Sequence, residues 1–207
     1  MNTEMIEMPA AYVEFESFKI SKDVHFQCFH GKPFYPLDPM RSLDCITVDS
    51  IATALTRTTR FSGRTKRFYS VAEHSLYVAG RLPVQFQLGG LLHDAHEAFT
   101  GFGDVCGTIK PDFLEDIEGG IDEAIAHKFG FRAEALWMPQ VAEADLYLLA
   151  QERHWLMEPH TLDVMWGEEI INIPPDERYT HMPTPMKAAD VKESFETMLR
   201  RLLPKKR

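Results

Sequence analysis

Apolar positions recur at the three-to-four residue spacing of amphipathic helices over most of the chain beyond about residue 49. Asp49 is a candidate cap for a first helix that ends in a basic stretch near Gly63. The best start signal is the capping box from Ser70 to Glu73, which opens a helix that Pro83 stops. The pattern predicts further helices over roughly residues 86–100, 112–129, 133–157 and 187–203.

The first forty residues have a different pattern, rich in aromatic residues and turn formers. Apolar alternation at Val24, Phe26 and Cys28, followed by a break at 31–33, predicts a short β-hairpin or an extended arm. The predicted fold class is therefore all-α with a short N-terminal hairpin. We divide the chain into an N-terminal extension, residues 1–44, and one helical core, residues 45–207.

Composition excludes several function classes. A formal net charge of −9 argues against a nucleic-acid polymer as partner, and no run of eighteen apolar residues predicts a membrane span. The three cysteines form no C-x-x-C pair, which favours a reducing compartment over a disulfide framework or a zinc knuckle. Since the N-terminus also lacks a secretory pattern, we expect a cytoplasmic protein.

An adjacent His93-Asp94 pair interrupts an apolar, helix-like run. Burying a carboxylate is costly unless it is paired or binds a metal, so the pair suggests metal ligands. On a continuous helix His93 and Glu97 share a face and Asp94 is turned by about 100° from His93, so Glu97 points at whatever the metal binds. The order H-x-x-H-E matches no metalloprotease motif, and we interpret His96 as a neighbouring or surface histidine.

Two further residues are candidates to complete the site. His74 opens its helix directly after the capping box, and the alternative for it is a packing role. Asp145 lies on an apolar stripe, and its alternative is a structural salt bridge, for instance to Arg153. With His93 and Asp94 they supply two nitrogens and two carboxylates, a set that suits Mn, Fe, Co, Ni or Zn better than Ca.

Local positive charge precedes His74, although the chain is acidic overall. This stretch is either a solvated basic loop or a binding site for a small anionic substrate, and no Walker A loop or Ser or Cys nucleophile motif accompanies it. The five basic residues are Arg57, Arg60, Arg64, Lys66 and Arg67.

The order His74, then His93-Asp94, then Asp145 on successive helices resembles the HD-domain phosphohydrolase superfamily over about residues 45–160. The likeness extends beyond these residues to the bacterial 5′-deoxynucleotidases, and still more to the deoxyadenosine triphosphohydrolases of bacteriophages. It is carried by the stretches 60–63, 69–75, 92–98, 103–110 and 143–145.

The resemblance implies an HD-domain helical bundle in which His74, His93, Asp94 and Asp145 hold a divalent transition metal, and Glu97 orients or deprotonates the attacking water. Other roles follow in the same way. Arg60 and Lys110 match phosphate-binding residues, Phe61 replaces a tryptophan that packs against the sugar, and Asp104 matches a residue near the sugar or leaving group. Homo-oligomers are common in that group, so we expect one here. An additional Mg is expected with a triphosphate substrate.

These observations favour a metal-dependent enzyme whose partner is a small deoxynucleotide. The preferred version hydrolyses a dATP-like deoxynucleoside triphosphate to deoxynucleoside and triphosphate. The alternatives are a 5′-deoxynucleotidase acting on monophosphates and a non-catalytic HD-fold module that binds nucleotides for regulation. A hydrolase of cyclic dinucleotides would carry a downstream G-Y-P signature, which this sequence lacks.

Overall fold

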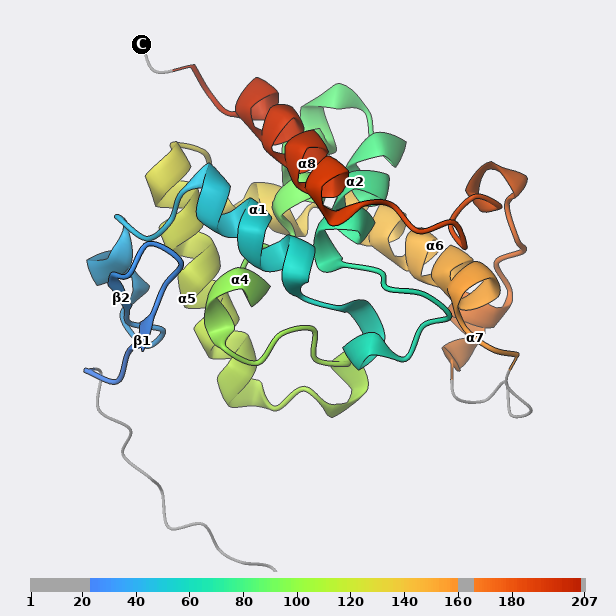
Figure 1. Ribbon diagram of the computed structural model, residues 1–207, viewed down its shortest axis with the longest axis horizontal. Helices are drawn as coiled ribbons and strands as arrows, with labels where there is room; N and C mark the ends of the chain where they lie inside the picture. The colour runs from blue at the N-terminus through green and yellow to red at the C-terminus, as the bar shows by residue number, and fades with distance from the viewer. Residues whose placement is uncertain (1–22, 160–165, 206–207) are drawn as a thin grey trace, which may run out of the picture.

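The computed structural model describes residues 23–159 and 166–205, and within them the chain is mostly helical with one small hairpin (Figure 1). The predicted fold class is confirmed. The helices are α1 Val48–Arg57, α2 Val71–Arg81, α3 Gln87–Leu92, α4 Glu97–Thr100, α5 Asp112–Phe129, α6 Pro139–Leu156, α7 Gly167–Ile171 and α8 Ala188–Leu202, and the strands are β1 Phe26–Gln27 and β2 Pro33–Phe34.

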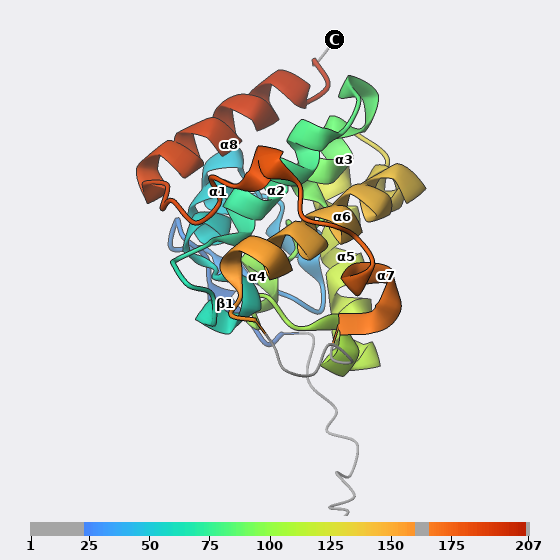
Figure 2. The ribbon, with the colours of Figure 1, turned by 90° about the vertical axis from the view of Figure 1, so that its right-hand side faces the viewer.

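Helix α2 is the central element, because α1, α3, α6 and α8 all contact it. Helix α8 lies across α1 and α2 on one side of the molecule, while α5 and the hairpin lie toward one end and α6 and α7 toward the other (Figures 1 and 2). No helix in the described part of the chain is both long and apolar enough to cross a membrane.

The hairpin predicted for the N-terminal region is present and joins the main core. Strands β1 and β2 pair antiparallel, with Phe26 opposite Phe34. Phe34 is fully buried and stacks on Phe99 of α4, with ring centroids 4.8 Å apart. Burying an aromatic side chain of this size contributes on the order of 2–3 kcal/mol. The hairpin therefore helps to fix α4, which carries Glu97.

The cap of helix α1 lies two residues before the expected one. The capping residue is Thr47, whose hydroxyl accepts the Ser50 N–H at 3.0 Å while the Ser50 hydroxyl accepts the Thr47 N–H at 2.9 Å. The prediction of Asp49 as the cap is wrong, because Asp49 lies in the first turn and pairs with Lys192 of α8 at 2.6 Å. An acid there still suits the positive end of the helix dipole.

Helix α2 starts where the sequence predicted. The Ser70 hydroxyl accepts the Glu73 N–H, but the Glu73 carboxylate binds Arg67 through two hydrogen bonds of 2.9 and 2.6 Å. Both side chains of this pair are nearly fully buried. The bidentate pair ties the basic loop down beside the first turn of α2, which holds His74.

The single helix predicted over 86–100 is wrong, since α3 ends at Leu92 and α4 begins at Glu97. Between them the chain forms tighter three-residue turns, with Ala95 N–H bonded to Leu92 O at 2.9 Å and Ala98 N–H to Ala95 O at 3.2 Å. Such turns rotate successive residues by about 120° instead of about 100°. Two consecutive glycines in α3 also lower the helix propensity just before the break. The His93-Asp94 pair therefore occupies a turn between two short helices.

The remaining helix predictions differ in their success. Helix α5 matches the predicted 112–129, and α8 matches 187–203 to within one residue at each end. The segment predicted as one helix over 133–157 divides into a 3₁₀ helix, Ala133–Trp137, and α6. Pro139 explains the division, because proline favours the first turn of a helix and cannot donate a backbone hydrogen bond within one.

Candidate metal centre

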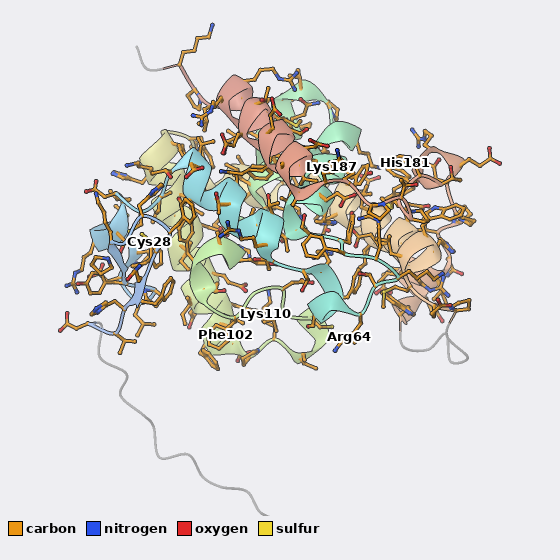
Figure 3. All side chains as sticks on the ribbon, in the orientation of Figure 1. Cys28, Arg64, Phe102, Lys110, His181 and Lys187 are labelled. Carbon is orange, nitrogen blue, oxygen red and sulfur yellow. The ribbon has the colours of Figure 1, made fainter. Side chains whose placement is uncertain are left out.

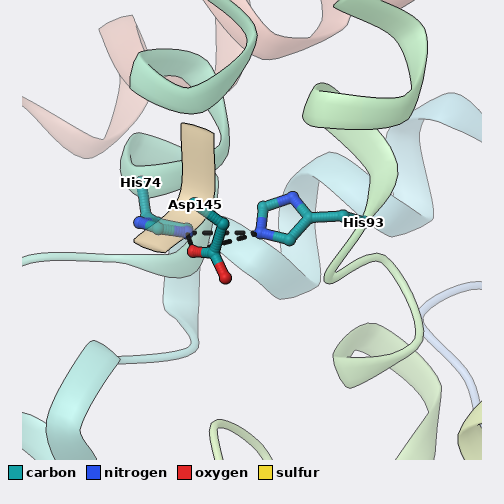
Figure 4. A group of neighbouring side chains, drawn as sticks. All are labelled: His74, His93 and Asp145. Carbon is teal, nitrogen blue, oxygen red and sulfur yellow. Dashed lines mark hydrogen bonds and ion pairs between the residues drawn. The ribbon is translucent and has the colours of Figure 1, made fainter. Parts of the chain in front are cut away.

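Four side chains from three parts of the fold converge on one point. His74 comes from α2, His93 and Asp94 from the turn after α3, and Asp145 from α6. His74 Nε2 lies 3.3 Å from His93 Nε2 and 3.0 Å from Asp145 Oδ1 (Figure 4). Asp94 Oδ2 lies 3.3 Å from His93 Nε2 and 3.8 Å from His74 Nε2. The structure thus brings all four predicted ligands together.

The spacing of these atoms fits one small cation. Ligand atoms about 2.1 Å from a metal lie about 3.0 Å apart at octahedral angles and about 3.4 Å apart at tetrahedral angles. The contacts to His74 and His93 span 3.0 to 3.8 Å. His74, His93 and Asp145 form a compact group that could hold a metal ion. Asp94 Oδ2, which is buried and has no hydrogen-bond partner, is a fourth acceptor without a donor.

In both imidazoles the Nδ1 atom contacts an oxygen acceptor, which fixes the orientation of the ring. His74 Nδ1 lies 2.5 Å from Glu152 Oε1, and His93 Nδ1 lies 2.9 Å from the Gly90 carbonyl oxygen. Because each Nδ1 faces an acceptor, each Nε2 is left to present its lone pair toward the centre. This arrangement of an oxygen, an imidazole and a free Nε2 is typical of histidines that bind metals.

The electrostatics of the four groups show how strongly they attract positive charge. Burial and Arg60 lower the pKa of His74, but Glu152 and Asp145 outweigh them and raise it to about 10. Burial raises the pKa of Asp145, yet the two histidines pull it well below its usual value. Protons and a cation would therefore compete for the same nitrogen and oxygen atoms, so metal binding would release protons.

Glu97 lies beside this centre with one unsatisfied oxygen. Its side chain is buried, and Oε2 has no hydrogen-bond partner. Burial, followed by the charges of Asp94 and Asp104, raises the pKa of Glu97 well above its usual value. Glu97, Asp94 and His96 form a second group of residues that could hold a cation. The position suits a group that exchanges a proton close to the metal ligands.

Arg60 and Asp104 form a clamp over one side of the centre. The Arg60 guanidinium lies 3.2 Å from Asp104 Oδ1, 3.4 Å from Glu152 Oε2 and 3.6 Å from Asp94 Oδ2. The other oxygen of Asp104 accepts the Phe61 N–H at 2.6 Å. Both Asp104 oxygens are thus used to position Arg60 and its neighbour.

Phe61 adopts a left-handed backbone conformation, with φ of 54°, and Ser62 follows it with φ of 51°. Such angles are strained for residues other than glycine and are found most often at functional sites. The Phe61 ring makes an edge contact with Trp166, with centroids 6.1 Å apart, and lies 5.4 Å from the Arg60 guanidinium. The hydrogen bond from the Phe61 N–H to Asp104 supports this conformation.

Lys110 lies at the same side of the molecule as Arg64 and Phe102 (Figure 3). Its ammonium donates to Glu118 Oε2 at 2.9 Å. Burial lowers the pKa of Lys110, but the charges of Glu118, Asp94 and Glu97 raise it above its usual value. The ammonium is therefore a cation close to the acids of the centre, as a phosphate-binding role would require.

No known protein-family model matches the chain. It is 36% identical over 128 residues to the uncharacterized protein YfdR of Escherichia coli strain K12, which is 60% of this chain and 68% of YfdR. The chain belongs to the YfdR family. The name of that relative states no activity, so membership in the YfdR family assigns no chemistry to this site.

Sequence reasoning missed Glu152 in this YfdR-family chain, although it binds three residues of the site. Glu152 is fully buried and contacts His74, Arg60 and the Tyr69 hydroxyl, the last at 2.9 Å. Its signal was its position seven residues after Asp145 on α6, two helical turns along the same face. Asp145 itself pairs with His74 and His93, and the acid on the same helix that supports the site from behind His74 is Glu152.

Of the two interpretations of His96, a neighbouring or a surface histidine, the surface one is wrong, since its side chain is buried. Its Nδ1 lies 3.1 Å from Asp122 Oδ1, so it binds α5 as a close neighbour of the centre. Trp166 was also missed, because nothing in the sequence around it pointed to Phe61.

Proposed function

We propose that the protein is an HD-type phosphohydrolase that uses a divalent transition metal to cleave deoxynucleotides at the 5′ phosphate ester. The observation that carries the proposal is the approach of two histidine Nε2 atoms to 3.3 Å, each oriented through Nδ1, beside Asp94 and Asp145. Without a cation or a shared proton, two such lone pairs would repel each other. The order of the four residues in the chain further supports an HD-type site.

His74, His93, Asp94 and Asp145 would hold the metal, which is Mn, Fe, Co, Ni or Zn by its donor set. When bound, such an ion lowers the pKa of a coordinated water and polarises a phosphoryl oxygen. Glu97 lies beside Asp94 with an unpartnered oxygen, so it is placed to orient the water and accept its proton. Arg60 and Lys110 offset the charge of the phosphate.

In the preferred reaction, water attacks the phosphorus that carries the 5′ oxygen of a deoxynucleoside triphosphate. A new P–O bond forms, the bond from phosphorus to the 5′ oxygen breaks, and that oxygen takes a proton to give the deoxynucleoside and triphosphate. The likeness to the phage triphosphohydrolases favours this version and a dATP-like substrate, with an additional Mg on the phosphates. The same residues would serve a 5′-deoxynucleotidase acting on monophosphates.

A non-catalytic module that binds nucleotides for regulation is the alternative from another class. Glu97 disfavours it, because a buried carboxylate with an unpartnered oxygen is costly to keep without a chemical use. We also infer a cytoplasmic homo-oligomer, which size-exclusion chromatography with light scattering would test.

The deciding experiment is an assay of the purified protein with Mn or Co and a panel of deoxynucleoside mono- and triphosphates. Chromatography that separates phosphate from triphosphate identifies the bond that is cleaved, and the panel gives base preference. Asp94→Ala and Glu97→Gln should each lose at least about 100-fold in kcat. Asp190→Asn, an exposed acid on α8, is the matched control and should keep wild-type activity. No turnover with any first-row divalent metal would overturn the proposal.

A further inference from the structure

His96 lies between α4 and two acids on one face of α5. Its Nδ1 is 3.1 Å from Asp122 Oδ1, and its Nε2 is 3.8 Å from Glu118 Oε2. Glu118 and Asp122 are four residues apart, so they project from the same side of the helix. Both carboxylates are buried, at 7% and 2% exposure. His96 therefore offers one ring nitrogen to each of two buried acids.

The Glu118 oxygen that faces His96 is also the one that binds Lys110. Lys110 Nζ donates to Glu118 Oε2 at 2.9 Å. The second oxygen of Asp122 accepts the Trp137 indole N–H at 3.3 Å. A continuous row of polar contacts thus runs from Trp137 through Asp122 and His96 to Glu118 and ends at the Lys110 ammonium.

We propose that His96, held by Asp122, is a positioning residue that keeps Lys110 available to the substrate's phosphate. The inference rests on the proposed function, in which Lys110 contacts that phosphate. Glu118 and Asp122 are like charges buried close together, and they need positive charge or hydrogen-bond donors nearby. His96 supplies part of that need and shares Glu118 Oε2 with the lysine.

The flexible stem of lysine makes the arrangement sensitive to His96. Without the imidazole, Lys110 is the remaining neighbour of Glu118 Oε2 among the contacts in the described part of the chain, so its ammonium is drawn toward α5 and away from the phosphate. The residue would then bind the buried acid more strongly and the substrate more weakly. His96 acts through Lys110 and makes no contact with substrate.

His96→Gln tests this inference, because glutamine keeps one nitrogen donor for Asp122 but has no second nitrogen for Glu118. The metal-loaded variant should bind tripolyphosphate about tenfold more weakly by calorimetry, and its KM for the preferred nucleotide should rise by a similar factor with a smaller change in kcat. His181→Gln is the matched control. His181 is exposed, and its contact with the Tyr77 hydroxyl lies outside the group formed by His96, Glu118, Asp122 and Lys110. Wild-type tripolyphosphate affinity in a folded His96→Gln protein would overturn the inference.

A rescue experiment separates positioning from a general structural role. His96→Gln/Glu118→Gln removes the excess negative charge, so tripolyphosphate affinity should return to within about threefold of wild type. A double variant no better than His96→Gln would contradict the inference. If His96→Gln does not fold, Glu118→Gln alone is decisive, because it should bind tripolyphosphate as tightly as wild type or more so. Weaker binding by Glu118→Gln would overturn the inference.

Tripolyphosphate binding does not require turnover, so the two proposals fail separately. A wild-type protein that cleaves no nucleotide, yet shows the expected ranking of tripolyphosphate affinities, would refute catalysis and support the role of His96. A wild-type protein that binds no tripolyphosphate in its metal-loaded form would refute the role of His96.

Discussion

The Nε2 atoms of His74 and His93 face each other 3.3 Å apart, and neither ring can rotate without losing its Nδ1 contact. A cation that bridges these two atoms should therefore stabilise the folded state. At a concentration 100 times its Kd, Mn or Co should add about 2.7 kcal/mol to the free energy of unfolding. Thermal melts with metal and with EDTA measure the difference.

Asp145→Asn is the informative variant for this prediction. It removes the carboxylate that faces both histidines while keeping the shape of the side chain. The stabilisation by metal should fall sharply in Asp145→Asn. An equal metal-dependent shift in melting temperature in both proteins would mean that the ion binds somewhere else.

Glu152→Gln should weaken metal binding even though Glu152 is not itself a proposed metal ligand. Its carboxylate fixes the orientation of His74, and loss of such a partner costs about 10- to 100-fold in metal affinity. Titration against a chelating dye gives the affinity. Glu143→Gln changes an exposed acid on the same helix and should bind metal like wild type. Equal affinity in Glu152→Gln would show that His74 is oriented by its packing alone.

The cysteines should differ in reactivity at pH 8. Burial, and then the hydrogen bond with Cys28 at 2.8 Å, raise the pKa of Cys45 to about 12, so almost none of it is the nucleophilic thiolate. Cys106 is exposed. A disulfide reagent should react rapidly with one thiol in the native protein and with further thiols after unfolding in urea. In Cys106→Ser the rapid phase should disappear, and a rapid phase that persists would contradict the buried positions.

Gly89→Ala should destabilise the fold by at least about 1–3 kcal/mol. A Cβ at Gly89 would overlap the carbonyl of Ala135, which belongs to the backbone and not to a flexible side chain. Gly119 in the interior of α5 has open space around it, so Gly119→Ala should stabilise by about 0.5–1 kcal/mol. Urea denaturation measures both changes. A neutral Gly89→Ala would mean that α3 shifts easily against the segment beneath it.

Sequence patterns predicted the helices whose signals are local. Ser70 marked the start of α2, and the apolar period of α5 matched its bounds within the accuracy of such boundaries. The break after α3 could not be predicted in this way. Gly89 and Gly90 lie so close to Ala135 and Leu82 that a Cβ at either glycine would overlap them, and these neighbours belong to other segments of the chain. Local periodicity carries no information about such contacts.

The same limit applies to the site. The residue types and chain order identified the four candidate ligands, and the structure brings them together. The supporting residues Glu152 and Asp122 lie on helices, where the sequence alone is equally consistent with an ordinary solvated acid. Only the packing of α6 and α5 against the centre shows that these two acids are buried and bound.

Glu152 also restricts which sequences this fold accepts. One buried carboxylate satisfies His74, Arg60 and Tyr69 together, so a change at any one of them leaves the same charge less compensated. Relatives that lose Arg60 or His74 should therefore have replaced Glu152 as well. The ligand side and the phosphate side of the centre are expected to change as one unit during evolution.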